Sequence, residues 1–183
     1  MYDIHSHILW GIDDGAQQIE DSVAFLREYA RLGYRGIIAT PHLNHWMFET
    51  LGKTVYQSRL ASISSQMIQE GVDVKLGGEV MCRDDFILGF EEGRFSGIGG
   101  SWLVEFENRP GVFSPALEQM VFQFRLSDRN LILAHPERYG DIQNNTKIIE
   151  KLNGKFLDEI MVPKHDPSYK SGSMLKRRYE WVP

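Results

Sequence analysis

The pattern that most constrains the fold is an alternation of short apolar runs with longer stretches of helical periodicity. Buried strands separated by amphipathic helices form βα units around a parallel sheet. The sequence therefore predicts an α/β fold. The predicted strands are Tyr2–Ile4, Gly36–Thr40, Val74–Leu76, Leu103–Phe106 and Leu131–Ala134.

Four helices are predicted between or after these strands. Gly33 follows the first helix and Gly71 the second, and glycine commonly stands just past the end of a helix. Ser114 and Pro115 begin the third, since serine caps a helix and proline is tolerated at its first position. The predicted helices cover residues 18–32, 55–70, a segment from 114 whose apolar residues extend to 124, and 146–152.

A potential metal ligand stands at or near the carboxyl end of every predicted strand. In a barrel of parallel strands these ends converge on one rim, where catalytic groups gather. We therefore expect side chains that are distant in sequence to meet around one centre. In chain order they are His5 and His7, His42, Glu79, Glu105 and His135.

Each of these residues also has a simpler interpretation. His5 and His7 would point to the same side of a strand and reach one ion, but such a pair alone is more often not a ligand pair. His42, after a Thr-Pro turn, is equally weak by itself. Glu105 lies in an apolar run, where an unpaired carboxylate is expensive to bury. An arginine partner or a metal ion would satisfy it equally well.

Two consecutive acids precede Gly15 and the first helix. Asp13 and Asp14 suit turn and cap chemistry as well as metal ligation, and we favour Asp14 as the ligand. Imidazoles and carboxylates without thiolates suit manganese, zinc or iron rather than a structural cysteine site. So many ligands indicate two or three ions, which favours hydrolysis of a phosphate ester over that of an amide.

Other classes of protein fit the sequence less well. The formal net charge of -5 argues against a nucleic-acid-binding protein. The single cysteine, Cys82, is followed six residues later by Leu88 and not by the arginine of a cysteine phosphatase. A GxSxG motif of a serine hydrolase is missing. Neither a signal peptide nor a membrane-spanning run is visible, so we expect a cytoplasmic protein.

Two further features concern the substrate. Arg138, three residues after His135, is a candidate for bidentate contact with a phosphate group. Trp46, Phe48 and Tyr139 are candidates to line a pocket for an aromatic substrate, although aromatic side chains more often only pack.

The segments HSHILWGIDDGA, IIATPH, GGE, LVEF and LILAHPERY together resemble the polymerase-and-histidinol-phosphatase (PHP) superfamily. Within it they are most similar to the manganese-dependent tyrosine phosphatases of bacterial capsule and exopolysaccharide operons. The resemblance covers about residues 1–153, with the motifs in the family's order. It implies a distorted barrel of parallel strands and surrounding helices, with a three-metal cluster at the carboxyl rim.

The resemblance also implies residue roles. His5 and His7 would bind one ion, and Glu79 would bridge two. Arg138 would hold the phosphate, and the residues assigned to catalysis are Arg138 and His42. The implied metal is Mn2+, as two or three ions, with zinc or iron as alternatives. The implied substrate is the phosphorylated tyrosine-rich tail of a bacterial autokinase that governs polysaccharide export. The remaining metal ligands would be Asp14, His42, Glu105 and His135.

Residues 154–183 depart from the family pattern. The family closes its cluster with a late Asp-x-His motif, which is missing here, and His165 and Asp166 stand adjacent in the reverse order. We therefore expect a phosphatase domain in residues 1–153, a divergent or truncated tail, and a barrel that is incomplete at its carboxyl end. Two alternatives stay open: a small-molecule phosphatase of the histidinol phosphatase kind, and a metal-binding remnant without activity. We expect no nucleic-acid or membrane partner, and the oligomeric state is left open.

Overall fold

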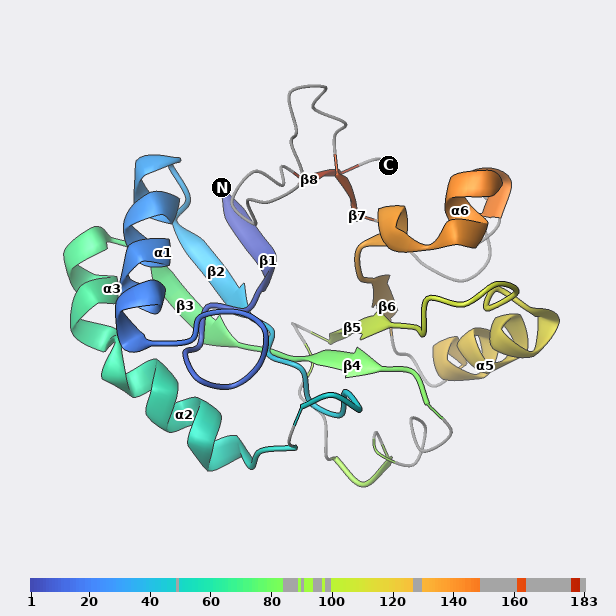
Figure 1. Ribbon diagram of the computed structural model, residues 1–183, viewed down its shortest axis with the longest axis horizontal. Coiled ribbons are helices and arrows are strands. Elements are labelled where there is room, and N and C mark those ends of the chain that lie inside the picture. The colour runs from blue at the N-terminus through green and yellow to red at the C-terminus, as the bar shows by residue number, and fades with distance from the viewer. Residues whose placement is uncertain are drawn as a thin grey trace. The chain divides into compact units, whose positions relative to one another are not determined.

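The computed structural model of the 183-residue chain is shown in Figure 1. It divides into two compact units, Met1–Gly99 and Gly100–Pro183, and each is described by itself. The described residues are 1–48, 50–83, 89, 91–93, 97, 100–126, 130–148, 161–163 and 179–181.

A parallel sheet organises the first unit. Its order is β1-β2-β3, with both neighbouring pairs parallel. Three of the predicted strands are thereby confirmed, together with their parallel pairing. A short fourth strand, which was not predicted, begins at Glu79. The strands are β1 (Tyr2–Ser6), β2 (Gly36–Ala39), β3 (Asp73–Leu76) and β4 (Glu79–Met81).

Three helices accompany this sheet, and α1 and α3 lie beside each other (Figure 1). Helix α1 matches the first predicted helix. Its first turn is capped by Asp21, whose Oδ2 accepts hydrogen bonds from the backbone N–H groups of Gln17 and Gln18 at 3.0 and 2.9 Å. The bounds are α1 (Ile19–Arg31), α2 (Lys53–Ser62) and α3 (Ser64–Glu70).

The prediction of one continuous helix over residues 55–70 was wrong, because the helix breaks at Ile63. Ser62 provides the physical reason. Its hydroxyl donates to the carbonyl oxygen of Arg59 at 2.7 Å and accepts from the indole N–H of Trp10 at 2.9 Å. A serine that bonds back to the preceding turn weakens a helix at that point.

The core of the first unit lies between the sheet and its helices. Large aliphatic residues that are no more than 4% exposed contribute to it. Burying such a side chain contributes about 1.5–3 kcal/mol. They include Ile8, Leu26, Ile37, Ile63 and Val74.

The second unit also contains a parallel strand pair, β5 with β6. Both strands confirm the sequence prediction. Ser114 caps α5 as expected, since its hydroxyl accepts from the Leu117 N–H at 3.4 Å. A short 3-10 helix, η1, and helix α6 follow β6 and were not predicted. The elements are β5 (Ser101–Glu105), α5 (Pro115–Arg125), β6 (Asn130–Leu133), η1 (Pro136–Arg138) and α6 (Gly140–Asn144).

Two short strands lie near the carboxyl end of the chain. β7 (Met161–Pro163) pairs antiparallel with β8 (Tyr179–Trp181). Most of the predicted helix 146–152 lies outside the described residues, as do His165 and Asp166. The division of the chain at residue 153 and the closure of a barrel therefore stay predictions. Within the described part of the chain, every helix is too short or too polar to cross a membrane.

Gly15 is required by the close packing of the loop that follows β1. A Cβ added there would lie 2.1 Å from the carbonyl oxygen of His7 and 2.3 Å from the His7 Cβ. The same carbonyl accepts a hydrogen bond from the Ala16 N–H at 3.0 Å, which holds the loop against the strand end.

We expect the substitution Gly15→Ala to destabilise the protein by about 1–3 kcal/mol, because the added methyl group has to displace backbone. Urea denaturation measures the change. Gly52→Ala is the matched control, since no atom lies within 4 Å of a Cβ added there and its φ is negative. Equal stability of the two variants would contradict the packing role of Gly15.

Candidate metal centre

Three ligand atoms from two strands meet at the carboxyl end of β1. His5 lies in β1, His7 follows the strand by one residue, and Glu79 is the first residue of β4. The Glu79 Oε2 lies 3.1 Å from the Nε2 of His5 and 3.1 Å from the Nε2 of His7. The two Nε2 atoms are 3.2 Å apart. The predicted convergence of these three residues is therefore present within the first unit.

This triangle has the dimensions of one metal coordination site. Ligands bound to a zinc-like ion at about 2.1 Å, at octahedral to tetrahedral angles, lie roughly 3.0–3.4 Å from one another. All three edges fall in that range. Two imidazole nitrogens and a carboxylate oxygen are also a donor set that suits manganese, iron or zinc. The residues therefore fit a divalent cation in both distance and chemistry.

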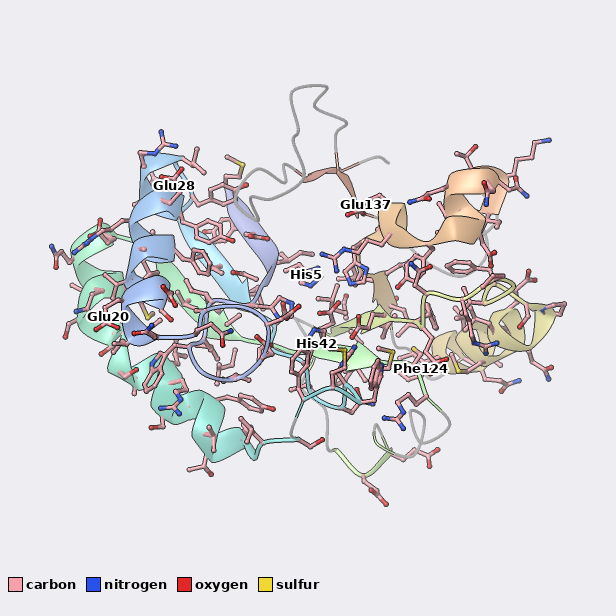
Figure 2. All side chains as sticks on the ribbon, viewed as in Figure 1. His5, Glu20, Glu28, His42, Phe124 and Glu137 are labelled. Carbon is pink, nitrogen blue, oxygen red and sulfur yellow. The ribbon has the colours of Figure 1, made fainter. Side chains whose placement is uncertain are left out.

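A second group of ligand atoms adjoins the first and shares His7 with it. It consists of His7, Asp14 and His42, whose ligand atoms all lie within 4.8 Å of one another. His42, labelled in Figure 2, follows β2 in the chain, and its Nε2 is 3.6 Å from the Asp14 Oδ1. Its Nδ1 is 3.5 Å from the Glu79 Oε2. Glu79 thus adjoins members of both groups.

The backbone around His42 and Glu79 is paired directly. The two residues form a parallel bridge, in which the Leu43 N–H donates to the Glu79 carbonyl at 3.0 Å. Asn44 reinforces the pair, because its side chain accepts from the Met81 N–H at 2.7 Å and donates to the Met81 carbonyl at 2.9 Å. This role of Asn44 was missed from the sequence, where an asparagine in a loop has no distinguishing signal.

Asp13 orients the histidines, whereas Asp14 faces solvent. The buried Asp13 Oδ2 accepts from the Nδ1 of His7 at 2.8 Å and from the backbone N–H of His42 at 3.0 Å. Its Oδ1 accepts from the Gly15 N–H at 3.0 Å, which is the turn role expected from the sequence. A carboxylate on one imidazole nitrogen directs the other nitrogen toward a metal. The orienting role was not foreseen.

The carboxylates control protonation of the metal-free cluster. Burial alone lowers the pKa of His7, but hydrogen bonds and charge from Asp13 and Glu79 outweigh it and raise that pKa to about 10. A hydrogen bond from His42 is the main cause that lowers the pKa of Asp14 to about 2. Burial raises the pKa of Asp13, yet its contacts with His7 leave it below the usual value. His7 is therefore protonated near neutral pH when no metal is bound.

Two further predicted ligands lie together in the second unit. Glu105 ends β5 and His135 follows β6, and the Glu105 Oε2 is 3.5 Å from the His135 Nε2. Both side chains are buried. His135 adopts φ 35° and ψ 57°, and it is the only non-glycine residue with positive φ among the described residues. Backbone strain of this kind is concentrated at functional sites.

Arg138 and Tyr139 differ in their surroundings. Arg138 is exposed at the end of η1, and its backbone N–H donates to the His135 carbonyl at 2.9 Å. Tyr139 is only 1% exposed, and its hydroxyl accepts from the backbone N–H of Phe106 at 3.0 Å. Tyr139 therefore packs in the core and ties the end of β5 to the segment after β6. Of the two roles considered from the sequence, lining a substrate pocket or packing, the structure shows packing.

Comparison with known proteins places this site in context. Residues 1–158 match the family model described as capsular polysaccharide synthesis, CpsB/CapC. The chain is 28% identical to CapC of Staphylococcus aureus over 162 residues, covering 87% of the chain and 64% of that protein. It is 30% identical to the tyrosine-protein phosphatase YwqE of Bacillus subtilis over 154 residues, covering 83% of the chain and 60% of that protein.

A solved structure is similar as well. It comes from a study of YwqE from Bacillus subtilis and CpsB from Streptococcus pneumoniae, described as unique metal-dependent tyrosine phosphatases. The match has a TM-score of 0.75 at 27% identity and covers 86% of this chain and 64% of the other. The mixed α/β fold with parallel strand pairs is therefore that of these proteins. The chain spans between 60% and 64% of the lengths of the curated relatives named above.

We expect the substitution Asp13→Asn to weaken Mn2+ binding by about 10–100-fold, because an amide holds the His7 imidazole less firmly in its ligating orientation. Isothermal titration calorimetry measures the dissociation constant. Asp73→Asn, at an exposed position of β3, is the matched control. Unchanged Mn2+ affinity in the Asp13 variant would show that the carboxylate does not orient the ligands.

We expect Mn2+ affinity to rise with pH, since the ion displaces the proton that His7 holds in the metal-free protein. The pKa of His7 is about 10, so displacement of one proton makes binding about tenfold tighter per pH unit below that value. Calorimetry at pH 6.5 and pH 7.5 in two buffers of different ionisation enthalpy measures both the affinity and the released proton. A pH-independent affinity without proton release would contradict the assigned protonation state.

Proposed function

Because the chain belongs to the CpsB/CapC family of capsular polysaccharide synthesis, we propose that it is a metal-dependent phosphatase that hydrolyses phosphate monoesters, with protein phosphotyrosine as its substrate. The observation that carries the proposal is the triangle formed by the Nε2 atoms of His5 and His7 and the Glu79 Oε2. A donor set of these dimensions around the buried Glu79 suits a catalytic cation, and the named relatives are tyrosine phosphatases.

The proposed ions are Mn2+, with zinc or iron as alternatives. His5, His7 and Glu79 would hold the first ion. His7, Asp14 and His42 would hold a second, with Glu79 between the two. Ions in such a site neutralise phosphate charge and make a water molecule acidic enough to supply hydroxide near neutral pH. The full proposed ligand set adds Glu105 and His135, which a distorted parallel β/α barrel would bring to the same rim.

The roles of the chain's own residues follow from their contacts. Asp13 keeps the Nδ1–H of His7 engaged, so that its Nε2 points to the Glu79 carboxylate. Arg138, exposed beside the strained His135, would pair with the phosphoryl oxygens of the substrate. His42 is the proposed catalytic residue of the first unit, because it contacts both the solvent-facing Asp14 and the buried Glu79.

We further propose that the substrate is the phosphorylated tyrosine-rich tail of a bacterial autokinase that governs polysaccharide export. The family description supports this assignment, since it places the matching proteins in capsular polysaccharide synthesis. The proposed location is the cytoplasm, as expected from the sequence.

The direct test is phosphate release from a phosphotyrosine peptide with added Mn2+. We expect turnover in the metal-loaded protein and its loss after chelation. Glu79→Gln keeps the size of the side chain but removes its charge, so we expect a loss of activity of at least 100-fold, on the scale of losing a ligand that two metal ions share. Glu20→Gln, exposed at the start of α1 (Figure 2), is the matched control and should retain full activity.

Near-normal turnover by Glu79→Gln would contradict its bridging role. Soluble, folded protein that binds Mn2+ but releases no phosphate would instead favour the inactive metal-binding protein considered from the sequence. Histidinol phosphate serves as a second substrate, because faster release from it than from the peptide would favour the small-molecule phosphatase.

A further inference from the structure

A cluster of aromatic rings adjoins the metal centre at His42. The ring of Phe48 stacks on that of His42, with centroids 5.1 Å apart and an interplanar angle of 17°. The ring of His45 lies 4.6 Å from His42, and Trp46 stacks on His45 at 5.7 Å with an angle of 24°. We refer to residues His45–Phe48 as the aromatic loop. It extends from a predicted metal ligand outward to the protein surface.

The aromatic loop has a defined conformation. The Met47 N–H donates to the Nδ1 of His45 at 3.1 Å, and the Phe48 N–H donates to the His45 carbonyl at 3.2 Å. These bonds hold the loop in a tight turn around His45. A turn of this kind presents its side chains in a fixed arrangement, so that little conformational entropy is lost when a ligand binds.

The outer part of this loop is exposed although it is apolar. Trp46 is 67% exposed and Met47 is 61% exposed. A large aromatic side chain at the surface is informative, since tryptophan is highly buried on average and enriched at binding sites. The proposed ligands near this loop are buried, in contrast to its outer part. His42 is 7% exposed and Glu79 is 1% exposed.

One member of the second ligand group faces solvent. Asp14, the third member of the second ligand group, has a side chain that is 64% exposed and contacts the Nε2 of His42 at 3.6 Å. His42 therefore touches the accessible ligand through its ring nitrogen and the aromatic loop through its ring face. A phosphate monoester held by a cation at His7, Asp14 and His42 would place its ester group near this loop.

We propose that the aromatic loop binds the phenyl ring of an aryl phosphate monoester, through Trp46 and Phe48, and thereby selects aryl over alkyl phosphates. The proposal rests on the proposed phosphatase function and names the part of the site that recognises the leaving group. In an aryl phosphate the ring is joined to phosphorus through a single oxygen atom, so that a ring-binding surface has to adjoin the phosphate site. Offset or edge-to-face contact with an aromatic ring then adds affinity that an alkyl group does not gain.

Binding of two phosphonates tests the proposal without turnover. Phenylphosphonate and methylphosphonate carry the same charged group on a P–C bond that a phosphatase does not hydrolyse. We expect Mn2+-loaded protein to bind phenylphosphonate about two- to tenfold more tightly, the range that one aromatic contact contributes. Trp46→Ala and Phe48→Leu should bring the ratio of the two dissociation constants, measured by calorimetry, close to one.

Met47→Ala is the matched control, because it removes an equally exposed apolar side chain from the same loop without removing a ring. It should leave the ratio unchanged. Mn2+ content is measured for every variant, since Phe48 also packs on His42. If Phe48→Leu loses metal, the result for Trp46→Ala alone decides. The ring of Trp46 stacks on His45 and not on the proposed ligand His42. Equal binding of both phosphonates by the unmodified protein, or an unchanged ratio in Trp46→Ala, overturns the proposal. If Met47→Ala loses as much of the preference for phenylphosphonate as Trp46→Ala does, the proposal is also overturned. The loop would then act by general apolar contact.

Activity separates a failure of this proposal from a failure of the proposed function. Phosphate release is compared for phosphotyrosine and phosphoserine peptides. Release from neither peptide refutes the phosphatase function, and the phosphonate ratio then still decides the role of the loop. If both peptides are hydrolysed at similar kcat/KM, and Trp46→Ala leaves the ratio of the two kcat/KM values unchanged, the phosphatase function stands. Selection by the aromatic loop is then refuted.

Discussion

The structure of the first unit depends on one buried carboxylate. Glu79 is 1% exposed, and its Oε2 lies within 3.5 Å of imidazole nitrogens from His5, His7 and His42. Burying a carboxylate without compensation costs several kcal/mol, so that such groups are found only beside cations or strong donors. Three imidazoles around a single oxygen provide that compensation either through protons or through a shared cation. The same requirement keeps the three histidines together.

Backbone pairing fixes the positions of these side chains before any side-chain contact is considered. β1 and β2 are parallel neighbours, and the Thr40 N–H donates to the Ser6 carbonyl at 2.8 Å, next to His5 and His7. His42 and Glu79 are joined by their own bridge, which Asn44 clamps to β4. A site built on paired backbone holds its ligands more firmly than one built on free loops. The ligand triangle therefore has a rigid frame on the sheet side and an exposed acid, Asp14, on the solvent side.

The sequence predicts the sheet better than the site's supporting residues, for a physical reason. Strands such as Gly36–Ala39 are runs of apolar residues whose burial depends on composition alone, and a ligand at a strand end follows from the topology. β4 is only three residues long and follows two glycines, so it has no periodicity to detect. The helix break at Ile63 depends on a contact between Ser62 and Trp10, 52 residues away. Long-range contacts of this kind are not visible in a local pattern.

The same limit applies to the two adjacent acids. The sequence favours Asp14 as the ligand but gives no sign of where either side chain points. Only the direction of the loop decides that Asp13 turns inward to His7 while Asp14 faces solvent. Similarly, Trp46 and Phe48 show aromatic character in the sequence, but the stacking of Phe48 on His42, the stacking of Trp46 on His45 and the exposure of Trp46 require coordinates. Family resemblance predicts the metal ligands, because they are read from motifs. Orienting and substrate-selecting residues have no such motif.

In the metal-free protein, protons compensate the charge of the carboxylates in place of an ion. The stability of the fold therefore depends on pH. The pKa of His7 rises from 6.5 in the unfolded chain to about 10 in the folded one, so protonation of His7 stabilises the fold fully below pH 6.5. That contribution is lost as the pH rises from 6.5 to 10. Asp14 acts in the opposite sense, since its lowered pKa stabilises the fold above pH 3.8 and the contribution is lost as the pH falls toward 2.

Both contributions are present in full only between about pH 4 and pH 6.5. A bound cation would compensate the same carboxylates without a proton on His7, and would therefore extend the stable range toward alkaline pH. The acids that assemble the site thus allow the unit to fold in either state. In the metal-free state the charge that balances Glu79 and Asp13 resides on His7, at the position that a cation would take over.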